Sequence, residues 1–257
     1  MNQNRVIAIA VAAVLAVVVL GYMGYRAFAA KDPLPTGSVD SGLSSLEKEL
    51  AVPGPLGDMS LGDKNAPVKV YEYASLTCSH CAEFNKDTFP AFKKNYIDTG
   101  KVYYTLRDFP FDPIATAGYM LAHCAGPERY FGFIDVLFST QAQWAFVQTP
   151  MEALKGIARQ GGFSEEKFDA CMKDEKIFEH VKATAQRGST EFGVRSTPTF
   201  FINGEKVEGA VPWEEFEPML KKHLPGGDTS AAETPAPSGE ATPATPENST
   251  PAAPEDH

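Results

Sequence analysis

Apolar and polar residues alternate along two stretches in the first half of the chain. Residues 68–74 read Val-Lys-Val-Tyr-Glu-Tyr-Ala, and residues 101–106 contain the run Val-Tyr-Tyr-Thr. This alternation of β-branched and aromatic residues predicts two strands. Further along, residues 199–202 and 205–207 flank the dipeptide Asn203-Gly204. An Asn-Gly pair between two apolar runs is the strongest short-range signal of a β-hairpin.

Between these strands the apolar spacing is helical. Residues 115–191 carry apolar side chains three and four positions apart and contain no convincing strand, which predicts a block of several helices. A helix is also expected to begin at residues 78–81, directly after the first strand, and another at Pro212, since proline is a favoured first residue of helices. The order β, α, β, helical block, β-hairpin, α predicts an α/β fold in which an α-helical domain is inserted into a small sheet.

The first thirty residues are expected to form a targeting segment. Residues 6–25 are apolar and uncharged, with an arginine on either side. About 20 apolar residues match a bilayer crossing and favour a retained membrane anchor. The Ala-Phe-Ala at residues 27–29 also fits the pattern that precedes signal-peptidase cleavage, so residues 1–30 are either an anchor or a signal peptide. In both cases we expect the rest of the chain to be exported.

Two further segments have the composition of unstructured chain. Residues 31–60 are rich in proline and glycine, with one short amphipathic stretch at residues 43–50, and this composition predicts a linker. Residues 225–257 hold seven prolines among Ala, Thr, Ser and Glu. Such a segment cannot bury enough apolar surface to fold, which predicts a disordered tail.

The charge of the chain is concentrated in that tail. The net charge is -10, and residues 225–257 contain six acidic residues and no lysine or arginine. The tail therefore carries -6 of the -10, which leaves -4 on the rest. The sequence contains no basic stripe, so we expect no nucleic-acid partner.

Four cysteines fall as one close pair, Cys78 and Cys81, and two single residues, Cys124 and Cys171. The close pair is compatible with ordinary buried thiols, with a zinc site or with a redox pair. A structural zinc site needs a second pair of ligands at similarly tight spacing. Cys124 and Cys171 lie 47 residues apart, and only His123 adjoins either of them. We therefore favour the redox pair and expect no metal.

The redox interpretation has a physical basis at Cys78. A thiol in the first turn of a helix meets unsatisfied backbone N–H groups and the positive end of the helix dipole, which favour the thiolate. Ser79 can add a hydroxyl donor, and His80 adds a positive charge when it is protonated. Cys81, one turn further, is expected to be more buried. Because a stabilised thiolate stabilises the reduced form, the disulfide form becomes a better oxidant.

A second motif lies at residues 194–200, Val-Arg-Ser-Thr-Pro-Thr-Phe. Proline before an apolar β run is a common feature of strand starts, but 120 residues after the first cysteine of the pair it resembles the cis-proline loop of the thioredoxin fold. Over about residues 60–224 the chain resembles the DsbA-like thioredoxin-fold family of bacterial envelopes. The features that carry this resemblance are Leu61-Gly62, Ala66-Pro67-Val68, the Glu72-to-Cys78 spacing, Cys-x-His-Cys, Arg107-Asp108-Phe109-Pro110, the helical insertion and Thr-Pro-Thr-Phe-Phe-Ile-Asn-Gly.

The resemblance implies a thioredoxin-like fold with an inserted α-helical domain. In this division, residues 61–111 and 192–224 form the two parts of the thioredoxin-like domain. Residues 112–191 then form the helical insertion.

The resemblance also implies roles for individual residues. Cys78 is the expected nucleophile, Cys81 its partner, and Pro198 the cis-proline that follows Thr197. Glu72 is the expected buried acid beneath the active site, where a raised pKa would let it pass a proton to or from Cys81. Alternatively, Glu72 points outward from an alternating strand. No cofactor is expected.

The function implied by the resemblance is oxidation of cysteine pairs in exported proteins in the periplasm, with reoxidation by a membrane quinone-linked partner of the DsbB type. Two residues depart from the family's oxidases, since Ser79 stands where they usually have proline and Thr197 where many have valine. Thr197 is shared with the family's isomerases and reductases, so an isomerase or reductase with the same active site is an alternative. A non-enzymatic envelope protein that binds extended peptides through the Thr197 loop is a second alternative.

Other residues are interpreted mainly as structural. Cys124 and Cys171 are expected to form a structural disulfide in the helical block, with two free buried thiols or a regulatory redox pair as alternatives. Arg107 and Asp108 are interpreted as strand-end structure. Three histidines lack a partner at a meaningful spacing and are interpreted as surface or core residues, and four aromatic residues are interpreted as core rather than as a substrate groove. These are His123, His180 and His223, and Phe131, Phe133, Trp144 and Phe146.

Overall fold

The computed structural model describes residues 39–226, which are built around one mixed sheet. Its five strands lie in the order β1-β3-β2-β4-β5. β2 and β3 are parallel, and the other neighbouring pairs are antiparallel. The strands are β1 (Met59–Leu61), β2 (Val68–Ala74), β3 (Val102–Asp108), β4 (Thr199–Ile202) and β5 (Glu205–Glu208). The two predicted strands and the predicted hairpin are confirmed, and β3 continues two residues beyond its predicted end.

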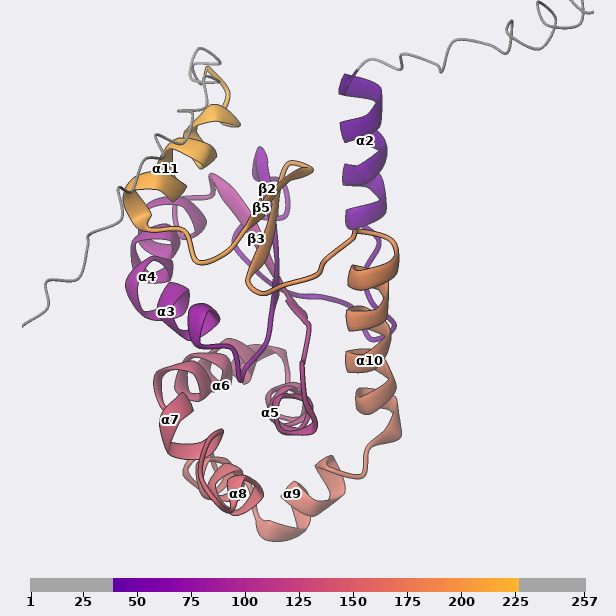
Figure 1. Cartoon of the computed structure of the whole chain (residues 1–257), viewed down its shortest axis with the longest axis vertical. Helices are drawn as coiled ribbons and strands as arrows, with labels where there is room; N and C mark the ends of the chain where they lie inside the picture. The colour runs from indigo at the N-terminus through magenta and orange to yellow at the C-terminus, as the bar shows by residue number, and fades with distance from the viewer. Residues whose placement is uncertain (1–38, 227–257) are drawn as a thin grey trace, which may run out of the picture.

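Helices cover both sides of this sheet (Figure 1). α3, α4 and α11 lie on one side, and α2 and α10 lie on the opposite side. The other helices of the insertion, α5 to α9, close one end. The helices are α2 (Val39–Leu50), α3 (Ser79–Asp87), α4 (Phe89–Phe92), the π-helical turn η1 (Lys93–Ile97), α5 (Pro113–Cys124), α6 (Pro127–Ser139), α7 (Gln141–Trp144), α8 (Pro150–Gln160), α9 (Glu165–Cys171), α10 (Glu175–Thr190) and α11 (Trp213–Lys222). This is the predicted α/β fold with an inserted α-helical domain.

Strand β2 lies in the middle of the sheet, and both of its faces are buried. Val70 and Ala74 belong to the larger core, on the side of α3. Tyr71 and Tyr73 belong to a smaller core on the opposite side. Because helices cover a central strand on both faces, both sets of alternating side chains are removed from water. Glu72 is therefore buried among apolar residues of the same strand.

Part of the predicted linker is structured. Helix α2 ends at Leu50, whose side chain is fully buried in the smaller core. Strand β1 pairs with β3 at the edge of the sheet. The last residue of α2 and the segment that connects it to β1, residues 50–58, are here called the arm, which contains half of the prolines and glycines of residues 31–60. The folded region therefore includes residues before Leu61, which the sequence pattern did not predict.

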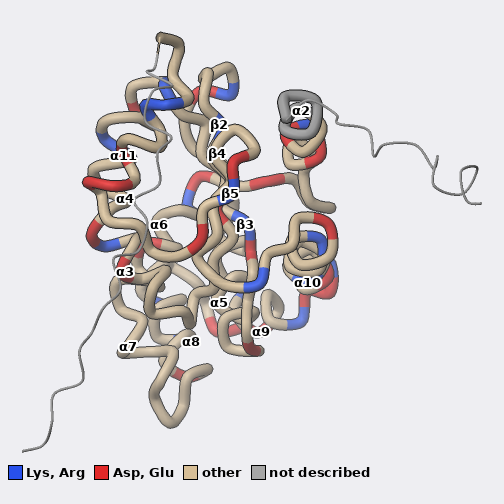
Figure 2. The backbone as a smooth tube through the Cα atoms, turned by 45° about the horizontal axis from the view of Figure 1, so that its top comes forward, with Lys and Arg blue, Asp and Glu red and all other residues tan. Residues whose placement is uncertain are grey.

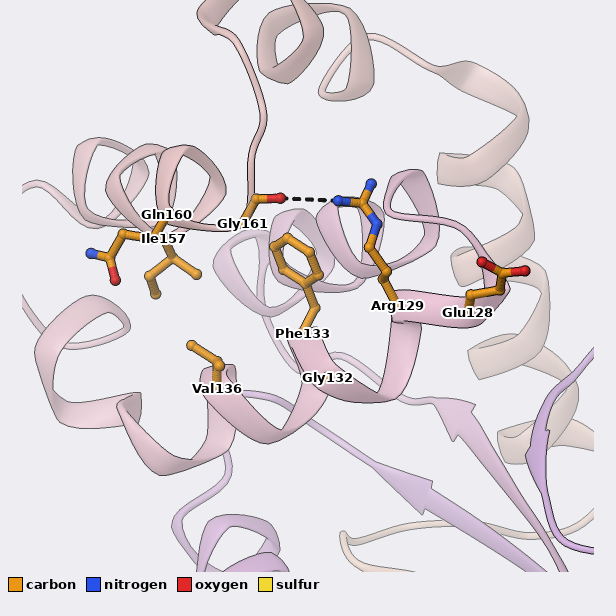
Figure 3. Close-up of a pocket in the computed structure, with 8 residues that line it drawn as sticks. All are labelled: Glu128, Arg129, Gly132, Phe133, Val136, Ile157, Gln160 and Gly161. Carbon is orange, nitrogen blue, oxygen red and sulfur yellow. Dashed lines mark hydrogen bonds between the residues drawn. The ribbon is translucent and has the colours of Figure 1, made fainter.

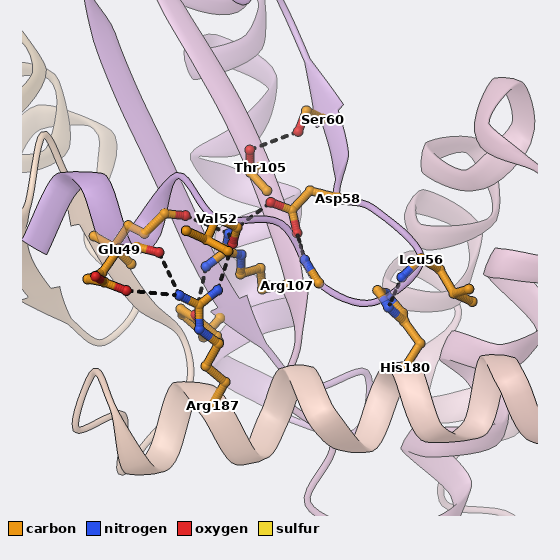
Figure 4. Close-up of polar contacts among 12 residues, drawn as sticks. Glu49, Val52, Leu56, Asp58, Ser60, Thr105, Arg107, His180 and Arg187 are labelled. Carbon is orange, nitrogen blue, oxygen red and sulfur yellow. Dashed lines mark hydrogen bonds and ion pairs between the residues drawn. The ribbon is translucent and has the colours of Figure 1, made fainter.

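The arm is held to the sheet by Arg107 of β3 (Figure 4). Its Nη2 donates to the carbonyl oxygens of Leu50 (2.6 Å) and Val52 (3.2 Å) and to Oδ2 of Asp58 (2.8 Å). Its Nη1 donates to the Tyr73 hydroxyl at 3.0 Å. The Arg107 side chain is 3% exposed, so these partners, rather than water, stabilise its charge.

Helix α10 holds the arm as well (Figure 4). Arg187 donates to the carbonyl oxygen of Val52 at 2.7 Å, and Nδ1 of His180 accepts a hydrogen bond from the N–H of Leu56 at 3.1 Å. The helix can approach β2 closely because residue 188 is glycine. A Cβ atom on Gly188 would lie 2.6 Å from the nearest tyrosine ring of that strand.

The helical insertion is cross-linked by a disulfide. Cys124, the last residue of α5, and Cys171, the last residue of α9, have their sulfur atoms 2.10 Å apart. The two cysteines are bonded in the structure, which agrees with the first of the three alternatives drawn from the sequence.

Three of the four aromatic residues singled out in the insertion pack in the core. Trp144 is fully buried, and Phe131 and Phe133 contact the larger core. Phe146 is 64% exposed, so the core interpretation was wrong for this residue, which lies in the loop between α7 and α8. Phe133 also lines an open groove of about 520 Å³ between α6 and α8 (Figure 3). None of the residues that line this groove belongs to the cysteine pair or to residues 194–200.

Acidic and basic residues are interspersed along the backbone of the described part (Figure 2). Local pairs form among them, such as Nε2 of His223 with Oε2 of Glu205 at 3.1 Å, a partner that sequence spacing did not indicate. No helix within residues 39–226 is long and apolar enough to cross a membrane. The predicted anchor or signal peptide (residues 1–30) and the chain from residue 227 onward lie outside the described residues.

Replacing Arg107 with leucine is expected to lower the free energy of unfolding by about 3–5 kcal/mol, the usual cost of removing one partner of a buried ion pair. The substitution leaves Asp58 and the carbonyl groups of the arm without their donor. Denaturant unfolding followed by circular dichroism measures the change. Arg159→Leu, at an exposed position of α8, is the matched control and should change stability by less than about 0.5 kcal/mol. Equal losses in the two variants would mean that Arg107 does not hold the arm.

Candidate active site

The close cysteine pair lies where β2 passes into α3. After Ala74 the chain makes a short turn, in which the N–H of Cys78 donates to the carbonyl oxygen of Ser75 at 3.0 Å. Cys78 is the N-cap residue of α3, with φ -84° and ψ 121°, and Ser79 is the first helical residue. Both thiols are free, with Cys78 half-buried and Cys81 fully buried. The predicted helix start and the greater burial of Cys81 are confirmed.

The surroundings of Cys78 favour its thiolate. The thiol of Cys81 donates a hydrogen bond to the Cys78 sulfur, and this contact contributes most to a pKa that is lowered from the ordinary 9.0 to about 5. Burial opposes the shift, while Thr197 and the backbone N–H groups of Cys81 and His80 add to it. At neutral pH the sulfur of Cys78 is therefore mainly ionised.

Cys81 has the opposite surroundings. Burial raises the pKa of its thiol well above the ordinary value, and its hydrogen bond to Cys78 and the negative charges of Cys78 and Glu72 raise it further. The pair thus combines one accessible thiolate with one buried thiol.

The loop that precedes β4 lies next to Cys78. In its protonated form the Cys78 thiol donates a hydrogen bond to the carbonyl oxygen of Thr197, 3.3 Å from the sulfur, although 119 residues separate the two. The peptide bond between Thr197 and Pro198 is cis, as the resemblance implied. The two motifs singled out in the sequence therefore form one site.

The residues between the two cysteines face solvent. The side chain of His80 is 70% exposed, and its Nδ1 lies 3.4 Å from Oε2 of Glu83. Ser79 is exposed as well. The sequence suggested that its hydroxyl can add a donor to the sulfur, but Ser79 is not among the groups that lower the pKa of Cys78. The groups that lower this pKa are the Cys81 thiol, Thr197 and the backbone N–H groups of Cys81 and His80.

Glu72 lies inside the larger core, near the cysteine pair. Its side chain is almost fully buried, and the hydroxyl of Tyr104 donates to its Oε2 at 2.6 Å. Burial raises the pKa of Glu72 to about 8, the hydrogen bond from Tyr104 opposes this shift, and the charge of Cys78 adds to it. The alternative in which Glu72 points outward is wrong, because β2 has no solvent face at this position.

Gln141 and Asp112, two residues of the insertion, hold the turn between β2 and α3 that carries Cys78. Neither residue was singled out from the sequence. Nε2 of Gln141, at the start of α7, donates to the carbonyl oxygens of Leu76 and Cys78, each at 2.9 Å. The Thr77 hydroxyl donates to Oδ2 of Asp112 at 2.5 Å, and Oδ1 of the same carboxylate caps α5. An aspartate before a proline at a helix start is a recognisable capping signal. Gln141 carries no such signal, because its partners are backbone groups more than 60 residues away.

His123 and His180 have a partner that the sequence did not indicate. Oδ2 of Asp108 lies 2.7 Å from Nε2 of His123 and 4.0 Å from Nε2 of His180. Within residues 39–226 this is the one group whose ligand atoms are close enough together for a metal ion. Because Nδ1 of His180 accepts the N–H of Leu56, the neutral ring carries its hydrogen on Nε2, the atom that a metal would need. The arrangement fits a hydrogen-bonded cluster better than a metal site.

Comparisons of the sequence with known proteins agree with this site. A family model described as thioredoxin matches residues 56–222. A Rickettsia typhi protein that is provisionally named a protein-disulfide oxidoreductase is 36% identical over 152 residues, which make up 59% of this chain and 56% of that protein. The chain therefore spans little more than half the length of this relative.

Solved structures with the same fold cover most of the described region. Alpha-DsbA1 of Wolbachia pipientis has 33% sequence identity and a TM-score of 0.63, over 68% of this chain and 94% of that one. BdbD of Bacillus subtilis has 22% identity and a TM-score of 0.60, over 67% of this chain and 95% of that one, and is similar in fold. On the family match and the likeness to alpha-DsbA1, the chain belongs to the thioredoxin family and, within it, to the DsbA-like proteins.

Proposed function

We propose that the chain is a thiol–disulfide oxidoreductase that introduces disulfide bonds into exported proteins through Cys78 and Cys81. The observation that carries the proposal is the contrast between two neighbouring thiols. Cys78 has a pKa of about 5 at the start of α3, whereas the pKa of the buried Cys81 is raised. The thiol with the lower pKa is the better leaving group in disulfide exchange.

The proposed reaction begins with the Cys78–Cys81 disulfide. A substrate thiolate attacks the Cys78 sulfur, so that a mixed disulfide forms and Cys81 leaves with an electron pair and takes up a proton. A second substrate thiolate then attacks the substrate sulfur of the mixed disulfide, and Cys78 leaves as a thiolate. The substrate loses two electrons and gains a disulfide, and the cysteine pair is reduced. Glu72 is the proposed proton donor to Cys81, because its raised pKa keeps it largely protonated at neutral pH.

The direction of the reaction follows from the same electrostatics. Stabilising the Cys78 thiolate stabilises the reduced pair and makes the disulfide a stronger oxidant. Isomerase or reductase activity at the same residues is the alternative, and Thr197, which the family's isomerases and reductases share, is the feature that favours it.

The proposed partners are exported proteins with free cysteines and a DsbB-type membrane quinone reductase that reoxidises the pair. The proposed location is the periplasm, at the extracytoplasmic face of the envelope, with residues 6–25 as a tether if they are retained. Disulfide formation belongs to such oxidising compartments, and the apolar run at the start of the sequence supports export.

The decisive experiment is oxidation of a reduced two-cysteine peptide by the oxidised full-length chain. Cys78→Ser and Cys81→Ser are both expected to abolish the reaction, because neither variant can form the Cys78–Cys81 disulfide. With the peptide supplied as its disulfide, Cys81→Ser is expected to trap a mixed disulfide through the Cys78 thiolate, which displaces one peptide thiolate. The double variant Cys124→Ala/Cys171→Ala is the control. It should retain the exchange and lose about 4 kcal/mol of stability, since that disulfide closes a loop of about 48 residues. Peptide oxidation that survives Cys78→Ser would overturn the proposal.

The direction is tested by equilibrating the Cys78–Cys81 pair with glutathione. An oxidase is expected to have a potential nearer to about -120 mV, whereas a potential near about -270 mV would assign the chain to the reductases.

The thiolate at Cys78 predicts the pH dependence of the reduced protein. Its ultraviolet thiolate absorbance and its alkylation rate should rise as the pH passes through about 5, and Cys78→Ser should remove this transition. Because the folded-state pKa lies below the ordinary 9.0, the stability that the thiolate contributes is fully present above pH 9 and is lost as the pH falls through about 5. Denaturation of the reduced chain and of Cys78→Ser across this range measures the difference. A transition near pH 9 would contradict the prediction.

A further inference from the structure

We infer that Tyr104 is a positioning residue for this exchange, because its hydroxyl fixes the Glu72 carboxyl group near the cysteine pair and favours the ionised form of that group. The inference rests on the proposed function and extends it to a residue on the neighbouring strand. The sequence placed Tyr104 only within the strand predicted at residues 101–106.

The geometry of the contact is specific. Tyr104 of β3 is paired with Val70 of β2 in the parallel register, so its side chain points to the same face of the sheet as Glu72. Its hydroxyl lies 2.6 Å from Oε2 of Glu72, and both side chains are 3% exposed. Within the described residues, Tyr104 is the one side chain that donates a hydrogen bond to the Glu72 carboxylate.

The ring of Tyr104 is held by aromatic neighbours. The ring centroids of Phe89, Phe92 and Phe131 lie 5.2, 5.7 and 6.2 Å from its own. These contacts fix the direction of the hydroxyl, so the bond to Glu72 is preorganised. They also mean that phenylalanine at position 104 would keep the packing and remove the hydroxyl alone.

The effect on proton transfer follows from the groups that face Glu72. These are Tyr104 of β3, Tyr119 of α5 and the two cysteines of the active site. Burial raises the pKa of Tyr104 well above its ordinary value, so its hydroxyl remains a donor throughout the working range. A donor stabilises the carboxylate more than the carboxylic acid. When Cys81 leaves as a thiolate, Glu72 gives it a proton and becomes a carboxylate, and the Tyr104 hydrogen bond stabilises that product.

The first test is the titration of Glu72 in the reduced full-length chain, followed by the infrared carbonyl band of its protonated carboxyl group. The midpoint is expected near pH 8 in the unchanged protein. In Tyr104→Phe it should rise by ~1–2 pH units, the shift expected from losing a hydrogen bond to a charged group. Glu72→Gln identifies the band, which it should remove. An unchanged midpoint in Tyr104→Phe would overturn the inference.

The matched control is Tyr119→Phe. Its hydroxyl is also fully buried and donates at 2.7 Å, but to the carbonyl oxygen of Ala74 rather than to Glu72. The control should lose stability as Tyr104→Phe does and leave the midpoint of Glu72 in place. An equal shift in both variants would mean that the effect is a general loss of packing, which overturns the inference.

The second test is kinetic and uses the reaction of the reduced chain with a peptide disulfide. In this direction Glu72 removes the proton from Cys81, so the rate of the resolving step should increase as Glu72 ionises. Tyr104→Phe should move this increase to higher pH, and in the Glu72→Gln background it should have no further effect. Glu72→Asp, which draws the carboxyl group away from the hydroxyl, should shift the increase in the same direction and keeps the test open if Tyr104→Phe folds poorly. If the unchanged chain performs no exchange, the proposed function fails. The infrared titration does not depend on exchange, so it still decides whether Tyr104 stabilises the ionised form of Glu72.

Discussion

The start of helix α3 at Cys78 is the constraint on which the rest of the site depends. A helix N-terminus leaves backbone N–H groups without partners, and here those of His80 and Cys81 point to a sulfur atom. The sulfur meets them only while the turn before the helix stays in place. That turn is held by Gln141 from the insertion, by the Thr77 hydroxyl and by a strand that is buried on both faces. The helical insertion is therefore part of the active site and not an addition to a complete domain.

Cys78, Cys81 and Glu72 influence one another, so their protonation is a property of the group. The thiolate of Cys78 raises the pKa of both other residues. When Cys78 enters a disulfide, that charge disappears, and the pKa of Glu72 should fall. Formation of the disulfide then favours the carboxylate, and reduction favours the acid. The redox state of the cysteine pair and the protonation of Glu72 are in this way coupled through the negative charge of the Cys78 thiolate.

Local signals were sufficient to predict much of the fold and the centre of the site. Asn203-Gly204 predicted the hairpin, and the cysteine spacing after a strand predicted the start of α3. Contacts between distant segments could not be predicted. Gln141 reaches backbone groups of a turn in another part of the chain, and the arm gains its order from Arg107, a residue of a different strand. In both cases the segment is ordered by a residue far away in the sequence, and its own residues do not reveal this contact. The composition of the arm therefore predicted only a linker.

Glu72 and Cys78 also act on stability in opposite directions. The pKa of Glu72 is raised from 4.5 to about 8, so its contribution to stability falls as the pH rises through that interval. The pKa of Cys78 is lowered from 9.0 to about 5, so its contribution grows over nearly the same interval. In the reduced chain the two contributions to the free energy of unfolding change with pH in opposite directions and largely cancel between about pH 5 and pH 8. The oxidised chain has no thiolate at Cys78, so only Glu72 changes its free energy of unfolding with pH. That contribution still falls as the pH rises, and the pH interval is narrower if the pKa of Glu72 is lower in the oxidised chain. Rising pH therefore increases the free energy of unfolding of the reduced chain relative to that of the oxidised chain. Because reduction takes up protons, rising pH also lowers the oxidising strength of the pair. The first effect offsets part of the second.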